Sequence, residues 1–67
     1  MKFTERFNEV LHGSKITQVQ LAEKLDISRQ AITNLKIGTS LPSLELLYKI
    51  CKVLDVSADY LLGLSDY

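Results

Sequence analysis

Residues 17–38 decide the fold, and they read TQVQLAEKLDISRQAITNLKIG. Thr17 and Gln20 have the spacing of a capping box, in which the threonine hydroxyl accepts a backbone N–H and the glutamine side chain reaches back. Ser28 is a second good helix N-cap, and the isoleucines on either side of it have the spacing of a hydrophobic staple. The stretch therefore predicts two short helices in succession, the second beginning at Ser28.

Only a few residues separate these two helices, so they must cross steeply rather than lie side by side. A steep crossing brings the two backbones close together and requires a small residue, which Ala22 supplies opposite Ile32 and Leu35. Asp26 lies in the turn, and aspartate tolerates left-handed backbone better than most residues. The other face of the second helix is left polar; it carries Arg29, Gln30, Thr33 and Asn34.

Apolar residues at helical spacing continue on both sides of this centre. Before it, the spacing predicts a helix from about Phe3 to His12, which Gly13 can end in the left-handed conformation. After it, Ser43 and Ser57 are the capping residues of two more helices, the second of them short. No strand pattern or linker interrupts the chain. We therefore expect a single all-α domain over residues 1–67, a compact five-helix fold.

Charge is balanced in total but not along the chain. Eight basic and eight acidic residues give a formal net charge of zero, which does not favour bulk attraction to nucleic acid. Four basic and two acidic residues lie between positions 14 and 42, however, whereas residues 53–67 carry three aspartates and no basic residue. Positive charge is thus concentrated around the two central helices.

Several classes of function are not expected. Cys51 and His12 are the only cysteine and histidine, so neither an internal disulfide nor a zinc site of Cys and His ligands can form, and no metal or cofactor is expected. No paired carboxylates, activated nucleophile or phosphate loop suggests an enzyme. No apolar stretch is long enough for a signal peptide or a membrane span. We expect a cytoplasmic protein with no membrane partner and no small-molecule ligand.

The polar face of the second central helix has the chemistry of DNA recognition. Arginine can bond to both O6 and N7 of guanine, and glutamine or asparagine can pair with adenine in the major groove. The helix N-terminus at Thr17 and Gln18 can bind a backbone phosphate, and Lys36 and Thr39 can hold another. A polar helix face alone is equally typical of a solvated surface, and capping alone can explain Thr17 and Ser28.

An ordered set of motifs resembles the lambda-repressor/Cro-like (XRE) helix-turn-helix regulators over nearly the whole chain. The matching motifs are Thr17-Gln18, Leu21-Ala22-Glu23-Lys24-Leu25, Ile27-Ser28-Arg29-Gln30-Ala31-Ile32, Gly38, Pro42-Ser43-Leu44, Leu54, Val56-Ser57 and Tyr60-Leu61-Leu62-Gly63. Two positions depart from the family pattern. Asp26 stands where the family most often has glycine, and Lys36-Ile37 replaces a common pair of glutamate and a polar residue.

The resemblance implies a five-helix domain, with a helix-turn-helix over about residues 17–37, that binds a palindromic double-stranded DNA operator as a homodimer and most often represses transcription. The residues expected at the DNA are Thr17, Gln18, Ser28, Arg29, Gln30, Thr33, Asn34, Lys36 and Thr39. Ala58, Tyr60 and Leu64 are expected at the dimer interface, although they could equally fold back on the first helix.

A different class of function also fits the sequence. With no net positive charge, the same fold could serve chiefly as a protein-interaction module, such as an antitoxin-like or antirepressor-like partner that uses the apolar, acidic C-terminus. Binding to DNA at low salt separates the two hypotheses.

Overall fold

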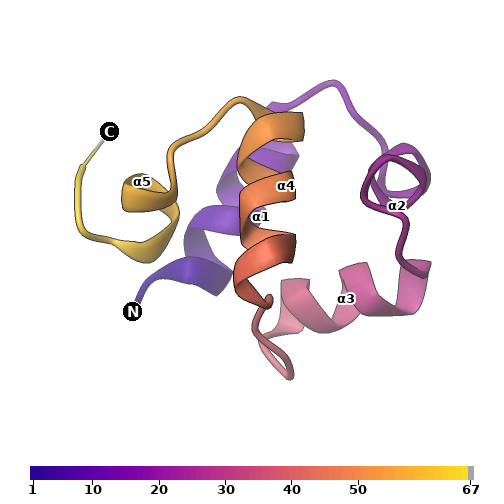
Figure 1. Ribbon diagram of the computed structural model, residues 1–67, viewed down its shortest axis with the longest axis horizontal. Helices are drawn as coiled ribbons and strands as arrows, with labels where there is room; N and C mark the ends of the chain where they lie inside the picture. Colours follow the sequence, from indigo (N-terminus) through magenta and orange to yellow (C-terminus); the bar gives the residue numbers. More distant parts are fainter. Residues whose placement is uncertain (67) are drawn as a thin grey trace.

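The computed structural model describes residues 1–66, and they form five helices with no strand (Figure 1). The prediction of an all-α, five-helix fold is confirmed. In chain order the helices are α1 (Phe3–Gly13), α2 (Gln18–Leu25), α3 (Arg29–Ile37), α4 (Leu44–Leu54) and α5 (Ala58–Leu62). Figure 1 shows α1 and α4 in the middle, α5 at one end and the α2–α3 pair at the other. No helix of the described part is long and apolar enough to cross a membrane.

Capping side chains set four of the five helix starts. Thr17 and Gln20 form both hydrogen bonds of the predicted capping box, at 3.1 and 2.9 Å. The hydroxyls of Ser28, Ser43 and Ser57 each accept the backbone N–H three residues later. Each of these bonds satisfies a donor that the first helical turn would leave unpaired. The predicted starts of these four helices are therefore confirmed.

One predicted helix end is wrong. Gly13 is the last residue of α1 and does not adopt a positive φ. Ser14 ends the helix with extended backbone at φ −87°, and its N–H donates to the carbonyl of Leu11. The left-handed ends occur instead at Asp26, Gly38, Asp55 and Gly63. A glycine near a helix end permits left-handed backbone but does not require it, and here the extended Ser14 leads directly into the loop.

A single hydrophobic core holds the helices together. Every helix contributes to it, and α1 contacts both α3 and α5 while α2 contacts α3 and α4. Phe3 and Phe7 stack with ring centroids 5.3 Å apart. The buried residues are Phe3, Phe7, Leu11, Leu21, Ala22, Leu25, Ile32, Leu35, Leu47, Ile50 and Leu61. Cys51 packs at the edge of this core, and burial raises the pKa of its thiol.

Candidate nucleic-acid interface

The helix α3 buries one face and exposes the other. Ile32 and Leu35 are 0% and 2% exposed and pack in the core. Arg29 and Gln30, in the first turn, are exposed, whereas Thr33 and Asn34 are half-buried. We call these four polar residues the reading face. The predicted division of α3 into a core face and a polar face is confirmed.

The turn before α3 fixes the direction of that helix. Asp26 is left-handed at φ 56° and ψ 46°, which is the conformation expected where glycine is more usual. The next residue, Ile27, donates its backbone N–H to the carbonyl of Ala22 at 3.0 Å. Ala22 itself is 5% exposed between the two helices. In Figure 1, α2 is seen nearly end-on while α3 runs across the page, so the two helices cross steeply as predicted.

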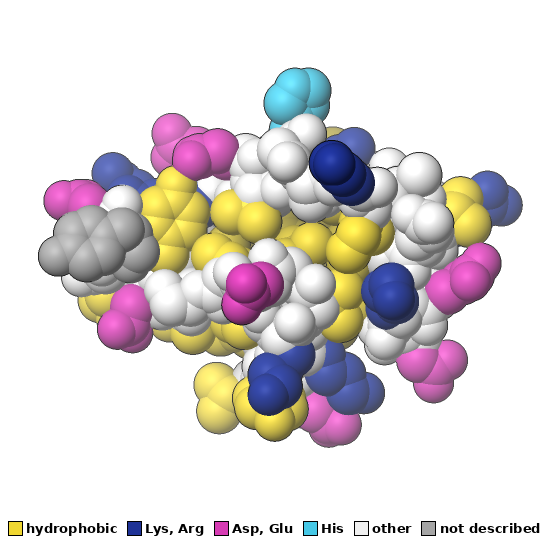
Figure 2. Space-filling view, turned by 90° about the horizontal axis from the view of Figure 1, so that it is seen from above, with side chains coloured by type: hydrophobic (Ala, Val, Ile, Leu, Met, Phe, Trp, Pro, Cys, Tyr) yellow, Lys and Arg dark blue, Asp and Glu magenta, His cyan; other side chains and the backbone are white. Residues whose placement is uncertain are grey.

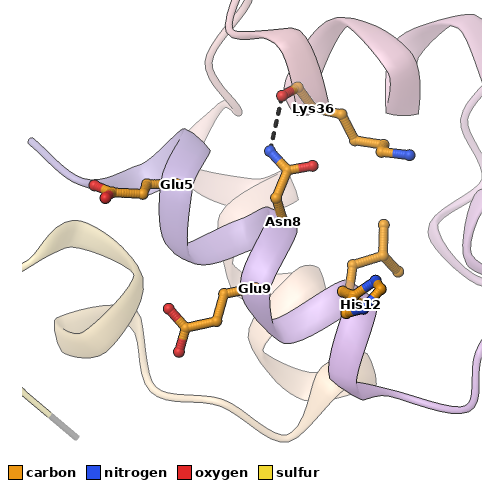
Figure 3. A pocket seen from close by; sticks show the side chains of 6 residues that line it. Glu5, Asn8, Glu9, His12 and Lys36 are labelled. Atoms are coloured by element: carbon orange, nitrogen blue, oxygen red, sulfur yellow. Dashed lines mark hydrogen bonds between the residues drawn. The ribbon is translucent and has the colours of Figure 1, made fainter.

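An asparagine on α1 fixes the other end of α3. The Asn8 side-chain amide donates to the backbone carbonyls of Thr4 and Lys36, both at 2.8 Å. Figure 3 shows the bond to Lys36. It thus satisfies a carbonyl in the last turn of α3 that has no partner within the helix. Gly38 follows at φ 87°, close to Thr4. Sequence reasoning missed Asn8, because no local pattern shows that α1 and the end of α3 meet.

A chain of hydrogen bonds joins the start of α2 to α3. The Lys36 ammonium donates to Oε1 of Gln18 at 3.3 Å, and Nε2 of Gln18 donates to the Thr33 hydroxyl at 3.0 Å. That hydroxyl donates to the Arg29 carbonyl at 3.2 Å. Gln18, which the sequence placed at the DNA, therefore has both ends of its amide bonded within the protein.

A second pair of amides lies on α3. Nε2 of Gln30 donates to Oδ1 of Asn34 at 3.0 Å, one helical turn apart. The Arg29 guanidinium has no hydrogen bond or ion pair with residues 1–66. The spacing of residues 30 and 34 could have indicated the amide pair in advance, since side chains four apart on a helix are neighbours.

Three further predicted residues lie around the reading face. The hydroxyls of Thr17 and Ser28 act as caps and remain exposed. Thr39, beyond the end of α3, donates its hydroxyl to the carbonyl of Asn34 at 3.4 Å and is also exposed. The structure therefore gathers all nine residues expected at the DNA on α2, α3 and the turns beside them.

A second surface has a different character from the reading face. Seen from above, apolar side chains run across the molecule among charges of both signs (Figure 2). Between α4 and α5 lies an apolar groove of about 380 Å³. Its lining residues are Leu44, Leu47, Tyr48, Cys51, Val56, Ser57, Ala58 and Leu62. Of these lining residues, Leu44 and Tyr48 are 85% and 64% exposed.

The residues expected at a dimer interface lie in three different settings. Ala58 lines the apolar groove, and Leu64 is 76% exposed. Tyr60 faces α1: its hydroxyl donates to Glu9, and the Arg6 guanidinium lies 4.3 Å from its ring centroid. The hydrogen bond to the Glu9 carboxylate favours the protonated phenol and raises the pKa of Tyr60. Arg6 also donates to the Tyr60 carbonyl at 2.8 Å, so Tyr60 is held against α1.

Residues 13–61 match the helix-turn-helix family model, which covers most of the chain and all nine residues expected at the DNA. The chain belongs to the XRE (Cro-like) helix-turn-helix family. An uncharacterized HTH-type transcriptional regulator of Methanocaldococcus jannaschii, MJ0272, is 39% identical over 59 residues, which are 88% of this chain and 86% of that protein. The HTH-type regulator YqaE of Bacillus subtilis, also uncharacterized, is 40% identical over 60 residues, 90% of this chain and 52% of its own length.

Other proteins that resemble the chain are longer. The transcriptional activator BcrR of Enterococcus faecalis is 40% identical over 63 residues, 94% of this chain but 31% of its own length. The chain thus spans about half the length of YqaE and about a third of the length of BcrR. The solution structure of a LexA repressor from Eubacterium rectale superposes with a TM-score of 0.84, covering 90% of this chain and 64% of that one, at 20% identity. That likeness concerns the fold.

Proposed function

We propose that this protein is a transcriptional repressor that binds a palindromic double-stranded DNA operator as a homodimer. The observation that carries the proposal is the division of α3: its apolar residues anchor it in the core, while Arg29 and Gln30 stand exposed in its first turn. A helix held in this way can enter the major groove with its N-terminal residues against the base edges. As a protein that acts on DNA within the cell, it is expected in the cytoplasm.

The residues divide into base contacts and phosphate contacts. Arg29 carries an unengaged guanidinium, which suits guanine O6 and N7. Thr17, Ser28 and Thr39 present exposed hydroxyls at helix ends around α3, where DNA phosphates would pass. Lys36 adds positive charge on the same side. Because the chain has no net charge, we expect these few contacts and the dimer geometry to supply most of the affinity.

A second copy accounts for the apolar groove. A palindromic operator places equivalent recognition helices one DNA turn apart, about 34 Å. The domain measures 28 Å along its longest axis, so two copies can lie side by side within about this spacing. The groove supplies an apolar contact surface away from the reading face, with Leu44, Tyr48 and Ala58 at its edge or lining. Leu64 follows α5 in the chain and is exposed, so it is available for the same contact with a second copy.

Relatives differ in the direction of regulation. BcrR is named an activator, whereas RstR of Vibrio cholerae is named a phage transcriptional repressor. RstR is 35% identical over 63 residues, which are 94% of this chain and 56% of RstR. We infer repression because occupancy of an operator by this domain suffices to block transcription. Activation requires in addition a contact with the transcription machinery.

Selection of bound sequences from a random DNA pool tests the proposal, followed by affinity measurements against salt concentration. We expect a palindromic motif with two half-sites. Arg29→Ala should weaken binding to the selected site by about 1–3 kcal/mol and relax the preference at one base. Lys36→Ala should weaken binding to all sequences. It should also reduce the slope of log affinity against log salt concentration by about one, the contribution of one phosphate contact. Lys49→Ala, which removes an exposed positive charge from α4, is the matched control and should change neither.

The apolar groove also favours the second candidate function, a protein-interaction module of the same fold. In that case a partner protein, rather than a second copy, would cover Leu44 and Tyr48. No measurable DNA binding at low salt, together with capture of a partner that Leu44→Asp abolishes, would replace the repressor proposal with this one. A selected motif without palindromic symmetry would retain DNA reading and overturn the homodimer.

A further inference from the structure

The Gln30–Asn34 amide pair leaves its two members with different hydrogen-bonding capacity. A side-chain amide has one carbonyl oxygen and two N–H donors. Gln30 uses one N–H on Asn34 and keeps its oxygen and its other N–H available. The Asn34 oxygen already accepts this bond, so Asn34 has mainly donors to offer. Gln30 is also the exposed member of the pair, whereas Asn34 is half-buried.

The free groups of Gln30 match one base in the major groove. Adenine presents an acceptor at N7 and a donor at N6, and a glutamine amide that offers one N–H and one oxygen can satisfy both. Guanine presents two acceptors there, cytosine a single donor, and thymine a single acceptor beside its methyl group, so none of these three satisfies both groups. A glutamine side chain is otherwise flexible, and ordering it on binding costs conformational entropy. The bond to Asn34 restrains Gln30 before DNA binds, which lowers that cost.

The other polar residues of this surface are less suited to forming this pair of hydrogen bonds with adenine. The Thr33 hydroxyl accepts from Gln18 and donates to the Arg29 carbonyl. Gln18 is held between Thr33 and Lys36 by both ends of its amide. Arg29 offers donors alone, which suit guanine. Gln30 is therefore the one exposed amide of the reading face whose oxygen accepts no bond from residues 1–66 and which also keeps a free N–H donor.

We propose that Gln30 reads an adenine in each half-site and that Asn34 is a positioning residue that orients Gln30 rather than a base contact. This inference rests on the proposed function, since it requires α3 to lie in the major groove. It adds a base identity and separates the roles of two residues that sequence reasoning treated as equivalent.

The test starts from the motif selected by the parent protein, whose appearance or absence decides the proposed function first. Each adenine of the half-site is then replaced in turn by 7-deazaadenine, which lacks the N7 acceptor. At one position the replacement should weaken parent binding by about 2- to 13-fold, the range for loss of one hydrogen bond. Gln30→Ala should bind the normal and the modified site equally, because the side chain that contacts N7 is gone.

Two substitutions at Asn34 separate positioning from reading. Asn34→Asp keeps an oxygen that can accept from Gln30 but has no N–H, whereas Asn34→Ala removes both. If Asn34 only positions Gln30, Asn34→Asp retains the parent's preference for adenine at that position, although its added negative charge weakens binding to every sequence. Asn34→Ala should lose much of the preference. Urea unfolding of each variant checks that the fold is intact.

The inference is overturned in two ways while the proposed function stands. The first is a motif in which no adenine shows both the 7-deaza effect and its loss in Gln30→Ala. The second is a loss of adenine preference in Asn34→Asp as complete as in Asn34→Ala, which would make Asn34 a base contact through its N–H donors. If the parent selects no motif at all, the proposed function fails and this inference fails with it.

Discussion

The reading face and the apolar groove are built in the same way but expose opposite chemistry. On one side α3 begins at a serine cap, buries Ile32 and Leu35, and exposes polar side chains that bond to one another. On the other side α4 also begins at a serine cap and buries Leu47 and Ile50, but it exposes Leu44 and Tyr48. Capping and core burial make the fold, so they do not distinguish the two surfaces. The remaining, exposed positions determine what each surface can bind.

The two sides also differ in how their side chains are restrained. Hydrogen bonds hold Gln18, Gln30 and Thr33 in place before any partner arrives. No such bond orders Leu44, and an apolar surface gains its binding energy by leaving water rather than by geometry. The comparison therefore predicts directional, sequence-dependent recognition on the reading face and less directional association at the groove.

The largest expected effect comes from removing the apolar anchor of α3. Ile32→Ala should lower the free energy of unfolding by about 2–5 kcal/mol, because it leaves a cavity at a fully buried site. Leu44→Ala, in the groove, should change it by less than about 0.5 kcal/mol, because Leu44 is 85% exposed. Urea unfolding at low protein concentration measures both. Equal effects would contradict the assignment of Leu44 to a surface available for a second copy.

A smaller effect is expected at the glycine that ends α3. Gly38→Ala should destabilise the domain by about 1–2 kcal/mol, because alanine at φ 87° is strained. An added Cβ would also lie 3.4 Å from the Thr4 hydroxyl oxygen. Gly13→Ala is the matched control: Gly13 is helical, and its Cβ would have no neighbour within 4 Å. It should stabilise the domain by about 0.5–1 kcal/mol in the same unfolding experiment. The same sign for both would be inconsistent with the two backbone conformations.

Two aspartates allow the turn before α3 to be compared directly with the turn before α5. Asp26 and Asp55 both adopt left-handed backbone, at φ 56° and 53°. Replacing either with glycine should relieve strain and raise the melting temperature, a gain of about 0.5–1 kcal/mol after the larger entropy of unfolded glycine is deducted. Similar gains would show that the two turns are equally strained. A loss at Asp26 alone would mean that its side chain supports the helix-turn-helix.

The smallest effect concerns alkaline pH at the contact between α1 and α5. The pKa of Tyr60 is raised by its hydrogen bond to Glu9, so the folded state favours the protonated phenol. The stability from this contact should be fully present below about pH 10 and be lost as the pH rises through the raised pKa. Tyr60→Phe should remove this part of the pH dependence, which the midpoints of urea unfolding between about pH 9 and 11 measure. An unchanged pH profile would mean that Tyr60 contributes nothing through that bond.

The elements of the fold could be predicted from the sequence because their signals are local. A cap and its N–H partner lie three residues apart, as at Thr17 and Ser28, and the apolar spacing of each helix lies within that helix. The left-handed turn at Asp26 is instead an expectation from the family resemblance, because the family most often has glycine there and aspartate tolerates that backbone. Gly13 shows the limit: its conformation depends on where the following loop must run, which a local pattern does not contain.

The sequence by itself determined the five helices, their starts and the polar character of the exposed face of α3. Only the tertiary structure decided which of those polar side chains remain free to bind. Gln18 meets Thr33 and Lys36 across the α2–α3 crossing, Asn8 meets the end of α3, and Tyr60 turns toward Glu9 on α1. These hydrogen bonds join residues distant in sequence. They form because core packing fixes how the helices lie against one another, and that packing depends on all five helices at once.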